Sequence, residues 1–538
     1  MASSAPRLSK SRFTSGLQCH KLLWWKVHDS KAVELQPDKV LKDRFDQGRQ
    51  VGELARTRYP GGVLIDLPYD AGAERVAATK AALDQGAPAV FEATFIADGM
   101  YVAIDVLEKL GDGYRVTEVK SSTSQKDEHI PDVAIQARVA AACGVHVSAA
   151  EVLHLNKEFR HPNSGDLFAR TDVTGEVAAF VGQVPEEIAR QQKMLAGPLP
   201  DVPIGLHCFE PHECPFMARC WPDTPDHIRH LAGVGPKKTA AYLERGITSI
   251  KDLPANERLN FTQKRQLKAM AENRVIVEPT LAAELAPFES PLSRRERGKG
   301  GEDFRPAPSS PPGPLSFQER GNDQASGGFR LGFLDFETIA RAVPVWPGMA
   351  PWQQAAAQFS YHEQQPDSTY THAAFLAEGP HDARPLLAAA MIQATANATR
   401  VVMYTPFEKT RIRDLQRAVP ELATELAALE AKLIDLHPVV KNCVYHPGFK
   451  GSFSLKYILT PLVPELTYND LVIVDGMVAS VEIARLLFVA DKIPQHERDR
   501  VRQDLLDYCK RDTWAMVRLV ERLHELALRP PSPERRGG

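Results

Sequence analysis

Short apolar runs alternate with helix-like stretches along most of the chain. In the C-terminal half, the run "GFLDF" from Gly332 and the run "RVVMY" from Arg400 predict buried strands. Helices are expected at 409–417, 420–434 and 494–526. The N-terminal half also mixes strands with helices. This alternation is typical of α/β layers, so we expect an α/β (α+β) multidomain chain.

One segment departs from this alternation. Residues 290–328 are rich in Pro, Gly, Ser and charged residues, and they cannot bury enough surface to fold by themselves. The motif "PLSRRERG" at Pro291 recurs as "PLSFQERG" at Pro314, as in inserted low-complexity sequence. The basic residues at 294–299 could contact phosphate, but a solvated linker is the favoured interpretation. We therefore expect this segment to separate two folded parts.

Composition limits the class of protein. A chain of 538 residues exceeds what one hydrophobic core supports and predicts about three domains. The hydrophobic content of 43% and the charged content of 25% are ordinary for soluble proteins. No apolar run is long enough to span a membrane, and "MASSAPRLSKSRF" lacks the apolar core of a secretory signal. We expect a cytoplasmic protein. With a net charge of −3, it would contact nucleic acid only through local basic patches.

The predicted strand at Gly332 carries two acids. Because side chains alternate across a strand, Asp335 and Glu337 share one face, while Leu334 and Phe336 take the other. Adjacent carboxylates repel each other and resist burial. A hard cation such as Mg²⁺ would turn this repulsion into binding. The alternative is a half-exposed strand with a solvated acidic face.

Further candidate residues follow in a specific order. Glu408 stands just beyond the second strand, at the start of a helix. Tyr508 and Asp512 are four residues apart on one face of the last helix, where a surface pair is the alternative. Asp-x-Glu on a first strand, an acid after a later strand and Tyr-x-x-x-Asp on a late helix resemble the DEDD exonucleases. These are the tyrosine-marked subgroup of the DnaQ-like branch of the ribonuclease H fold.

This resemblance covers about 329–525 and implies a phosphodiesterase. By resemblance, two Mg²⁺ or Mn²⁺ ions would be held by Asp335, Glu337, Glu408 and Asp512. Tyr508 would orient the attacking water. Two metals supply an activated water and a neutralised leaving oxygen. The family usually has Asp where Glu408 stands, so Asp435 in "KLIDLHP" is a reserve acid.

The N-terminal half holds a second candidate site. The strands "YVAIDVLEKL" and "YRVTEVKSS" are joined by "GDG", which predicts a hairpin. Asp105 lies in the first strand, and Glu118 and Lys120 share a face of the second. An acid plus Glu-x-Lys on adjoining strands resembles the PD-(D/E)XK nuclease core. The alternative is an exposed Glu/Lys hairpin.

The nuclease resemblance assigns roles to these residues. It implies that Asp105 and Glu118 bind metal and that Lys120 positions the water and phosphate. Glu92, in the strand "AVFEATF", could be a further ligand. Gln136 matches the start of the Gln-x-x-x-Tyr motif of the RecB-type branch, although Ala140 stands where that motif has Tyr.

Four cysteines flank this core: Cys19, Cys208, Cys214 and Cys220. In a cytosolic chain they favour a metal site over disulfides, and four thiolates suit Zn²⁺ or an iron–sulfur cluster equally in number. One early and three late cysteines resemble the iron–sulfur RecB-type nucleases, including the CRISPR-adaptation exonucleases, and imply a 4Fe–4S cluster.

The spacing of the late cysteines departs from the commoner family spacing, so Zn²⁺ remains an alternative. His207 or His212 could also replace one cysteine. The remaining cysteines are expected to be buried core thiols: Cys143, Cys443 and Cys509.

The stretch "GVGPKKTAAYLERGI" resembles a helix-hairpin-helix, in which helix N-terminal amides hold a phosphate beside Lys237 and Lys238. A small helical connector is the alternative. No Gly-x4-Gly-Lys-Ser/Thr motif is present, so an ATP motor is not expected.

The whole chain resembles a bacterial family that fuses these parts. The expected domains are a RecB-type PD-(D/E)XK nuclease with its cysteines, a helix-hairpin-helix-like module, a disordered linker, a DEDD exonuclease-like domain and a disordered tail, at 1–225, 226–285, 286–328, 329–526 and 527–538. The expected function is a metal-dependent 3′→5′ exonuclease on single-stranded or frayed DNA, with a second nuclease site, in repair or defence. Alternatives are an RNA-decay exonuclease and a nucleic-acid-binding adaptor with partly inactive sites.

Overall fold

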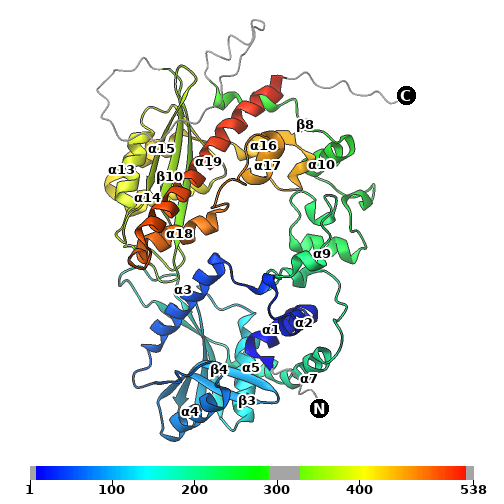
Figure 1. Ribbon diagram of the computed structural model, residues 1–538, viewed down its shortest axis with the longest axis vertical. Helices are drawn as coiled ribbons and strands as arrows, with labels where there is room; N and C mark the ends of the chain where they lie inside the picture. Colours follow the sequence, from blue (N-terminus) through cyan, green and yellow to red (C-terminus); the bar gives the residue numbers. More distant parts are fainter. Residues whose placement is uncertain (1–7, 290–327, 529–538) are drawn as a thin grey trace. The chain divides into compact units, whose positions relative to one another are not determined.

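The computed structural model describes residues 8–289 and 328–528. The chain divides into two compact units, both mixing strands and helices (Figure 1). Unit 1 comprises Met1–Asn256 and Ile339–Gln354, and unit 2 comprises Glu257–Thr338 and Ala355–Gly538. The expected linker, with its basic residues at 294–299, and the expected tail lie almost entirely outside the described residues.

The boundaries of the two units do not follow the expected linker. The first falls between Asn256 and Glu257, inside the expected hairpin module. The helix at Pro236–Glu244 therefore belongs to unit 1 and the helix at Phe261–Glu272 to unit 2. The segment Ile339–Gln354 follows the linker in sequence but is part of unit 1.

Unit 1 is built on one sheet with the strand order β2-β3-β4-β5-β6-β7, and β1 pairs with β4. The strands are β1 (Leu8–Ser9), β2 (Val63–Leu64), β3 (Ala89–Ala97), β4 (Met100–Leu110), β5 (Gly113–Lys120), β6 (Val147–Leu155) and β7 (Phe168–Asp172). The helices are α1 (Lys10–Gln18), α2 (His20–His28), α3 (Lys39–Arg56), α4 (Gly72–Asp84), α5 (His129–Ala142), α6 (Thr174–Val181), α7 (Val184–Leu195), α8 (Met217–Cys220) and α9 (Pro236–Glu244).

Two apolar clusters form the core of unit 1. The first packs α5 against β3, β4, β5 and β6 and includes Val133 and Ile135. The second joins Val51 and Ala55 of α3 to Ala342 of the returning segment. The predicted hairpin is confirmed, because β4 and β5 pair in antiparallel register around the "GDG" turn.

The sheet of unit 1 is interrupted where its acids stand. Pairing of β3 with β4 runs on both sides of Glu92 and Asp105 but skips this pair, and Glu92 has a left-handed φ of 56°. Ala89 and Phe91 therefore belong to one core cluster, whereas Ala93 belongs to the other. An uninterrupted strand would keep all three on one face. The regular β pairing is therefore absent at Glu92 and Asp105.

Unit 2 contains a five-stranded sheet in the order β11-β10-β9-β12-β13 and a small pair of strands, β14-β8. The strands are β8 (Ile276–Val277), β9 (Leu331–Ala340), β10 (Gln354–Gln364), β11 (Tyr370–Leu376), β12 (Arg400–Met403), β13 (Leu433–Asp435) and β14 (Val444–Tyr445). The helices are α10 (Phe261–Glu272), α11 (Leu281–Glu284), α13 (Arg384–Ala394), α14 (Phe407–Ala418), α15 (Ala423–Lys432), α16 (His437–Cys443), α17 (Leu455–Leu462), α18 (Gly476–Phe488) and α19 (Gln495–Leu528).

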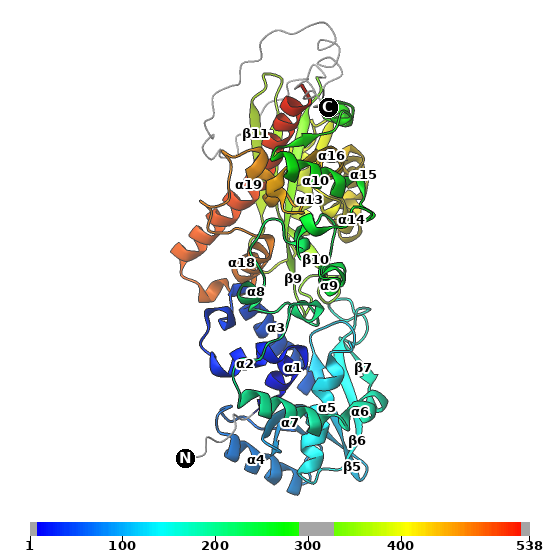
Figure 2. The same cartoon turned by 90° about the vertical axis from the view of Figure 1, so that its right-hand side faces the viewer.

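Helices cover both faces of the large sheet of unit 2. In Figures 1 and 2, α13, α14 and α15 lie on one side of the strands and α19 lies on the other. Leu334 and Phe336 pack with α13, α14 and α15, so the predicted division of the faces of β9 is confirmed. The helix expected at 420–434 is shorter, because Leu433–Asp435 pair with β12 as β13.

Two further expectations can be compared with the described residues. Cys443 and Cys509 are buried, but Cys143 is exposed, because it caps the C-terminal end of α5 at the surface. None of the helices within 8–289 and 328–528 combines the length and hydropathy needed to cross a membrane.

Candidate functional site

Three carboxylates of unit 2 meet across two elements. Asp335 and Glu337 project from β9 and Asp512 from α19, and one oxygen of each lies within 4.8 Å of the others. Glu337 and Asp512 are buried and Asp335 is half-buried. The alternative of a solvated acidic face is therefore wrong. Tyr508 and Asp512 are both buried as well, so they are not a surface pair.

Glu408 is a fourth carboxylate beside this triad. It stands in the first turn of α14 and is buried, and this burial, followed by the charge of Asp335, raises its pKa. Its second oxygen, Oε2, has no hydrogen-bond partner. The reserve acid Asp435 has a different position: its Oδ1 accepts hydrogen bonds from the backbone N–H groups of Thr405 (3.0 Å) and His437 (2.9 Å). Asp435 therefore fixes the turns that follow β12 and β13.

Two residues that sequence reasoning missed complete the cluster. Lys456 of α17 donates to the Tyr508 hydroxyl at 2.9 Å and to the Val474 carbonyl at 2.6 Å. The Tyr468 hydroxyl donates to Asp512 Oδ1 at 2.5 Å. Neither residue belongs to a motif that the sequence displays, because each reaches the site only through the packing of α17 and the following loop on α19.

The cluster is electrostatically strained without a cation. Burial, followed by the charges of neighbouring carboxylates, raises the pKa of Asp335, Glu337 and Glu408 well above the usual range. Burial also raises the pKa of Asp512, to about 6, although Tyr468 and Lys456 oppose the shift. Oxygen ligands with these properties suit a hard divalent cation.

Unit 1 brings its predicted residues together around Glu118. Lys120 Nζ lies 2.8 Å from Glu118 Oε1, and Gln136 Nε2 donates to Glu118 Oε2 at 2.6 Å. Asp105, on the neighbouring strand, accepts from the backbone N–H of Val119 at 2.7 Å. Glu118 is buried, so the hairpin does not carry an exposed Glu/Lys pair.

Glu92 lies between the paired residues Phe91 and Ala93 of β3, where the pairing with β4 skips it and Asp105. Its side chain is 41% exposed and lies 3.7 Å from an Arg75 nitrogen, so it borders the site without entering its buried part. Burial, followed by the charge of Glu118, raises the pKa of Asp105 to about 7. Glu118 shows the opposite shift: despite its burial, the Lys10 and Lys120 ammonium groups hold its pKa well below the usual range.

Two further groups of this site were missed from the sequence. Lys10 Nζ is 2.8 and 2.9 Å from the two oxygens of Glu118. Asp132 of α5 accepts from Lys120 Nζ at 2.5 Å. Asp132 precedes Gln136 by one helical turn, so the helical period of α5 could have indicated it. Lys10 carries no comparable signal, because 108 residues separate it from Glu118.

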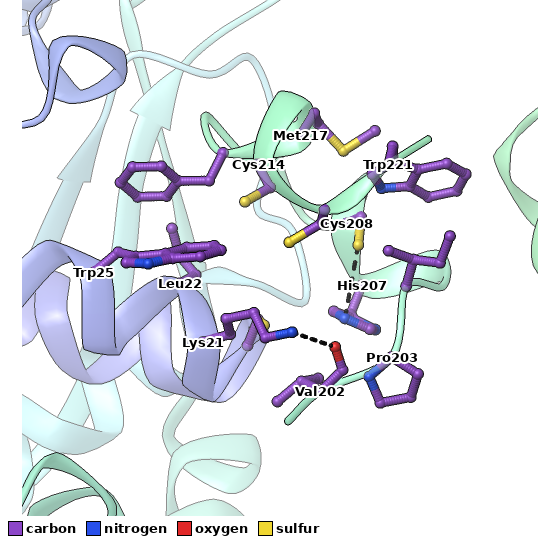
Figure 3. A pocket seen from close by; sticks show the side chains of 14 residues that line it. Lys21, Leu22, Trp25, Val202, Pro203, His207, Cys208, Cys214, Met217 and Trp221 are labelled. Carbon is purple, nitrogen blue, oxygen red and sulfur yellow. Dashed lines mark hydrogen bonds between the residues drawn. The ribbon is translucent and has the colours of Figure 1, made fainter. Parts of the chain in front are cut away.

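The four cysteines of unit 1 line one small pocket with a volume of about 20 Å³. Cys19 lies between α1 and α2, whereas Cys208, Cys214 and Cys220 lie in and around α8. Figure 3 shows the sulfur atom of Cys214 on the side of Trp25 and that of Cys208 directed toward His207 Nε2, 3.7 Å away.

The sulfur atoms are spread rather than clustered. Among the described residues, the carboxylate triad of unit 2 is the one group of three or more ligand atoms within 4.8 Å of one another. No three of the thiols therefore approach the S···S distance of about 3.8 Å that tetrahedral zinc with Zn–S bonds of about 2.3 Å requires. His207 also lines the pocket, whereas His212 is exposed and does not. Burial raises the pKa of Cys214 to about 11.

Comparisons with known proteins add a partial match. Residues 332–454 match a family described as "Domain of unknown function (DUF2779)". No curated protein matches the chain. Among solved structures, the chain is similar to one titled "Crystal structure of SSO0001", at 12% identity over 41% of this chain and 88% of that chain, with a TM-score of 0.19. That likeness carries no argument. The family match includes Asp335, Glu337 and Glu408 but ends before Asp512, so it covers part of the unit 2 site only.

Proposed function

We propose that this protein is a metal-dependent nuclease whose main site is the carboxylate cluster of unit 2. The observation that carries the proposal is the meeting of Asp335, Glu337 and Asp512 within 4.8 Å of one another, with the buried Glu408 close enough to Asp335 to interact with it electrostatically. Four carboxylates in one buried site repel each other strongly unless protons or cations compensate them. Their exclusive use of oxygen donors favours Mg²⁺ or Mn²⁺.

The residues around the cluster fit phosphodiester hydrolysis. Ions held by the four carboxylates would supply an activated water and a neutralised leaving oxygen. Tyr508 presents its hydroxyl beside Asp512, where it would orient the attacking water. Lys456 fixes that hydroxyl through the 2.9 Å hydrogen bond. The acid pair on the central strand of a mixed sheet supports the ribonuclease H-like, DEDD-type interpretation and, with it, 3′→5′ polarity.

The unit 1 site supports a second nuclease activity. Asp105 and Glu118 offer oxygen ligands from adjacent strands, Glu92 borders them, and Lys120 places an ammonium group against Glu118. Gln136 holds Glu118 in place. This set supports the RecB-type PD-(D/E)XK interpretation that the sequence indicates, and its substrate would be single-stranded or frayed DNA.

For the cysteine pocket, we favour a 4Fe–4S cluster over zinc. Four thiols line one pocket, and no three of their sulfur atoms lie as close together as the ligands of a single tetrahedral ion. Such a cluster would join residue 19 to residues 208–220 and stabilise unit 1 by closing a long loop. Anaerobically purified protein should be brown and contain about four irons, and Cys214→Ser should remove both. A colourless protein with one zinc would contradict the cluster.

The nuclease activity is tested with labelled single- and double-stranded DNA and RNA in Mg²⁺, Mn²⁺ or EDTA. Asp335→Asn should reduce exonuclease activity at least about 100-fold, and Glu118→Gln should remove a separable activity. Exposed Glu425→Gln and Glu53→Gln serve as matched controls in units 2 and 1. Unchanged cleavage by Asp335→Asn would refute the unit 2 site. Preferential cleavage of RNA would keep the site and change the substrate.

A further inference from the structure

A second lysine holds the central carboxylate of unit 1. Lys10 donates to both oxygens of Glu118, at 2.8 and 2.9 Å, while Lys120 and Gln136 each contact one of them. Glu118 is 2% exposed, so water does not compete effectively for its oxygens. With these contacts in place, both oxygens of Glu118 are engaged by Lys10, Lys120 and Gln136.

The fold fixes the position of the Lys10 backbone near Glu118. Leu8 and Ser9 form β1, which pairs in parallel with β4 at Met100 and Tyr101. Leu8 is fully buried and Ser9 caps α1, so the chain leaves the sheet at a fixed point. Lys10 is the first residue of α1 and points toward the part of β4 that carries Asp105.

The charges around Lys10 explain why a cation is needed at this position. Asp105, Glu118 and Asp132 are close enough to Lys10 for direct electrostatic attraction. Lys120 alone cannot balance three carboxylates. A divalent ion bound by Asp105 and Glu118 would supply the same compensation as the Lys10 ammonium, and the two cations would repel each other.

We propose that Lys10 is a cation switch: it holds the place of the metal ion in the metal-free site and, once displaced, binds the phosphate of the substrate. This inference rests on the proposed function of unit 1. After displacement, the Lys10 ammonium remains near the acids because Lys10 lies in the first turn of α1. There it would attract the negatively charged phosphate of a bound phosphodiester. An ion pair with only a structural role would instead stabilise the site with or without metal.

The test measures Mn²⁺ binding by electron paramagnetic resonance in full-length protein carrying Asp335→Asn, so that unit 1 dominates the signal. Lys10→Met should tighten Mn²⁺ binding about tenfold, because the lysine ammonium no longer competes with Mn²⁺ for Glu118. The same variant should lose single-stranded DNA cleavage at saturating Mn²⁺, and Lys10→Arg should restore part of it. Exposed Lys42→Met is the matched control and should change neither quantity.

Opposite results would overturn the inference. Weaker or unchanged Mn²⁺ binding by Lys10→Met would exclude competition between the lysine and the metal. Adding Asp105→Asn separates this failure from failure of the site: if Asp105→Asn leaves Mn²⁺ binding intact, unit 1 holds no metal at these residues and both proposals fall. If Asp105→Asn abolishes binding but Lys10→Met has no effect, the inference about Lys10 alone falls.

A measurement without a variant at Lys10 protects the test against misfolding. Mn²⁺ should increase acetylation of Lys10 by an amine-reactive reagent, measured by mass spectrometry, because the metal releases the ammonium from Glu118. Lys42 should react equally with and without Mn²⁺. Unchanged or reduced labelling of Lys10 in Mn²⁺ would overturn the switch.

Discussion

The carboxylate cluster of unit 2 should destabilise the protein when no metal is present. Two unit charges 4.8 Å apart repel by about 3.5 kcal/mol at an effective dielectric constant of about 20. The cluster lowers this repulsion by binding protons, as the raised pKa values of its members indicate. Asp335→Asn removes one charge and keeps the shape of the side chain. In EDTA at pH 8, we expect it to stabilise unit 2 by about 1–3 kcal/mol.

The pH dependence follows from the same shifts. A carboxyl group whose pKa is raised on folding contributes stability that is fully present below the unfolded pKa of about 4 and is lost as the pH rises through the folded pKa. For Asp512 the folded pKa is about 6. Metal-free wild-type protein should therefore lose stability in unit 2 from about pH 4 upward, and Asp335→Asn should reduce this slope.

Calorimetry of the full chain would measure both effects. In EDTA, the unit 2 transition of Asp335→Asn should lie about 2–8 °C above that of the wild type. Mg²⁺ at 100 times its dissociation constant should stabilise the wild type by about 2.7 kcal/mol and the variant much less, which closes or reverses the difference between their transition temperatures. The exposed Glu425→Gln is the control. A lower transition for Asp335→Asn in EDTA, or an equal response to Mg²⁺, would refute the reasoning.

Three further predictions concern Lys456, Tyr69 and the segment Ile339–Gln354. Lys456→Met should lower kcat about tenfold or more while leaving Mg²⁺ stabilisation intact, because it removes the donor that fixes Tyr508; an effect on KM alone would contradict this role. Tyr69 is exposed, and its ring contacts that of Tyr101 in a tilted arrangement with a centroid distance of 4.8 Å, so Tyr69→Ala should weaken single-stranded DNA binding by about 1–3 kcal/mol in a titration, whereas Tyr69→Phe should not. A fragment ending at residue 289 lacks Ile339–Gln354 and should unfold at lower urea than unit 1 of the full chain; equal midpoints would show that this segment is dispensable.

The assignment of Ile339–Gln354 to unit 1 could not be predicted from the sequence. The low-complexity linker indicates a division between two folded parts, and the domain boundaries followed from it. Yet Ala342, Trp346 and Met349 are each 1% exposed or less, and their segment belongs to unit 1. Composition shows where a chain cannot fold by itself, but it does not show which core a later apolar segment will complete.

The sequence by itself determined the elements that carry short-range information. The hairpin at Asp105 and Glu118 follows from alternation and a glycine turn, and the shared face of Asp335 and Glu337 follows from the strand period. These features depend on residues only a few positions apart in the sequence, so the pattern of apolar and polar residues can predict them.

Only the tertiary structure decided which distant groups join each site. Lys10 reaches Glu118 across 108 residues, and Tyr468 reaches Asp512 across 44. Glu92 was visible as an acid, but its left-handed φ of 56° and the resulting break in the sheet were not. Such contacts arise because buried charges need partners, and the partner is supplied by whichever element packs closest, whatever its place in the sequence.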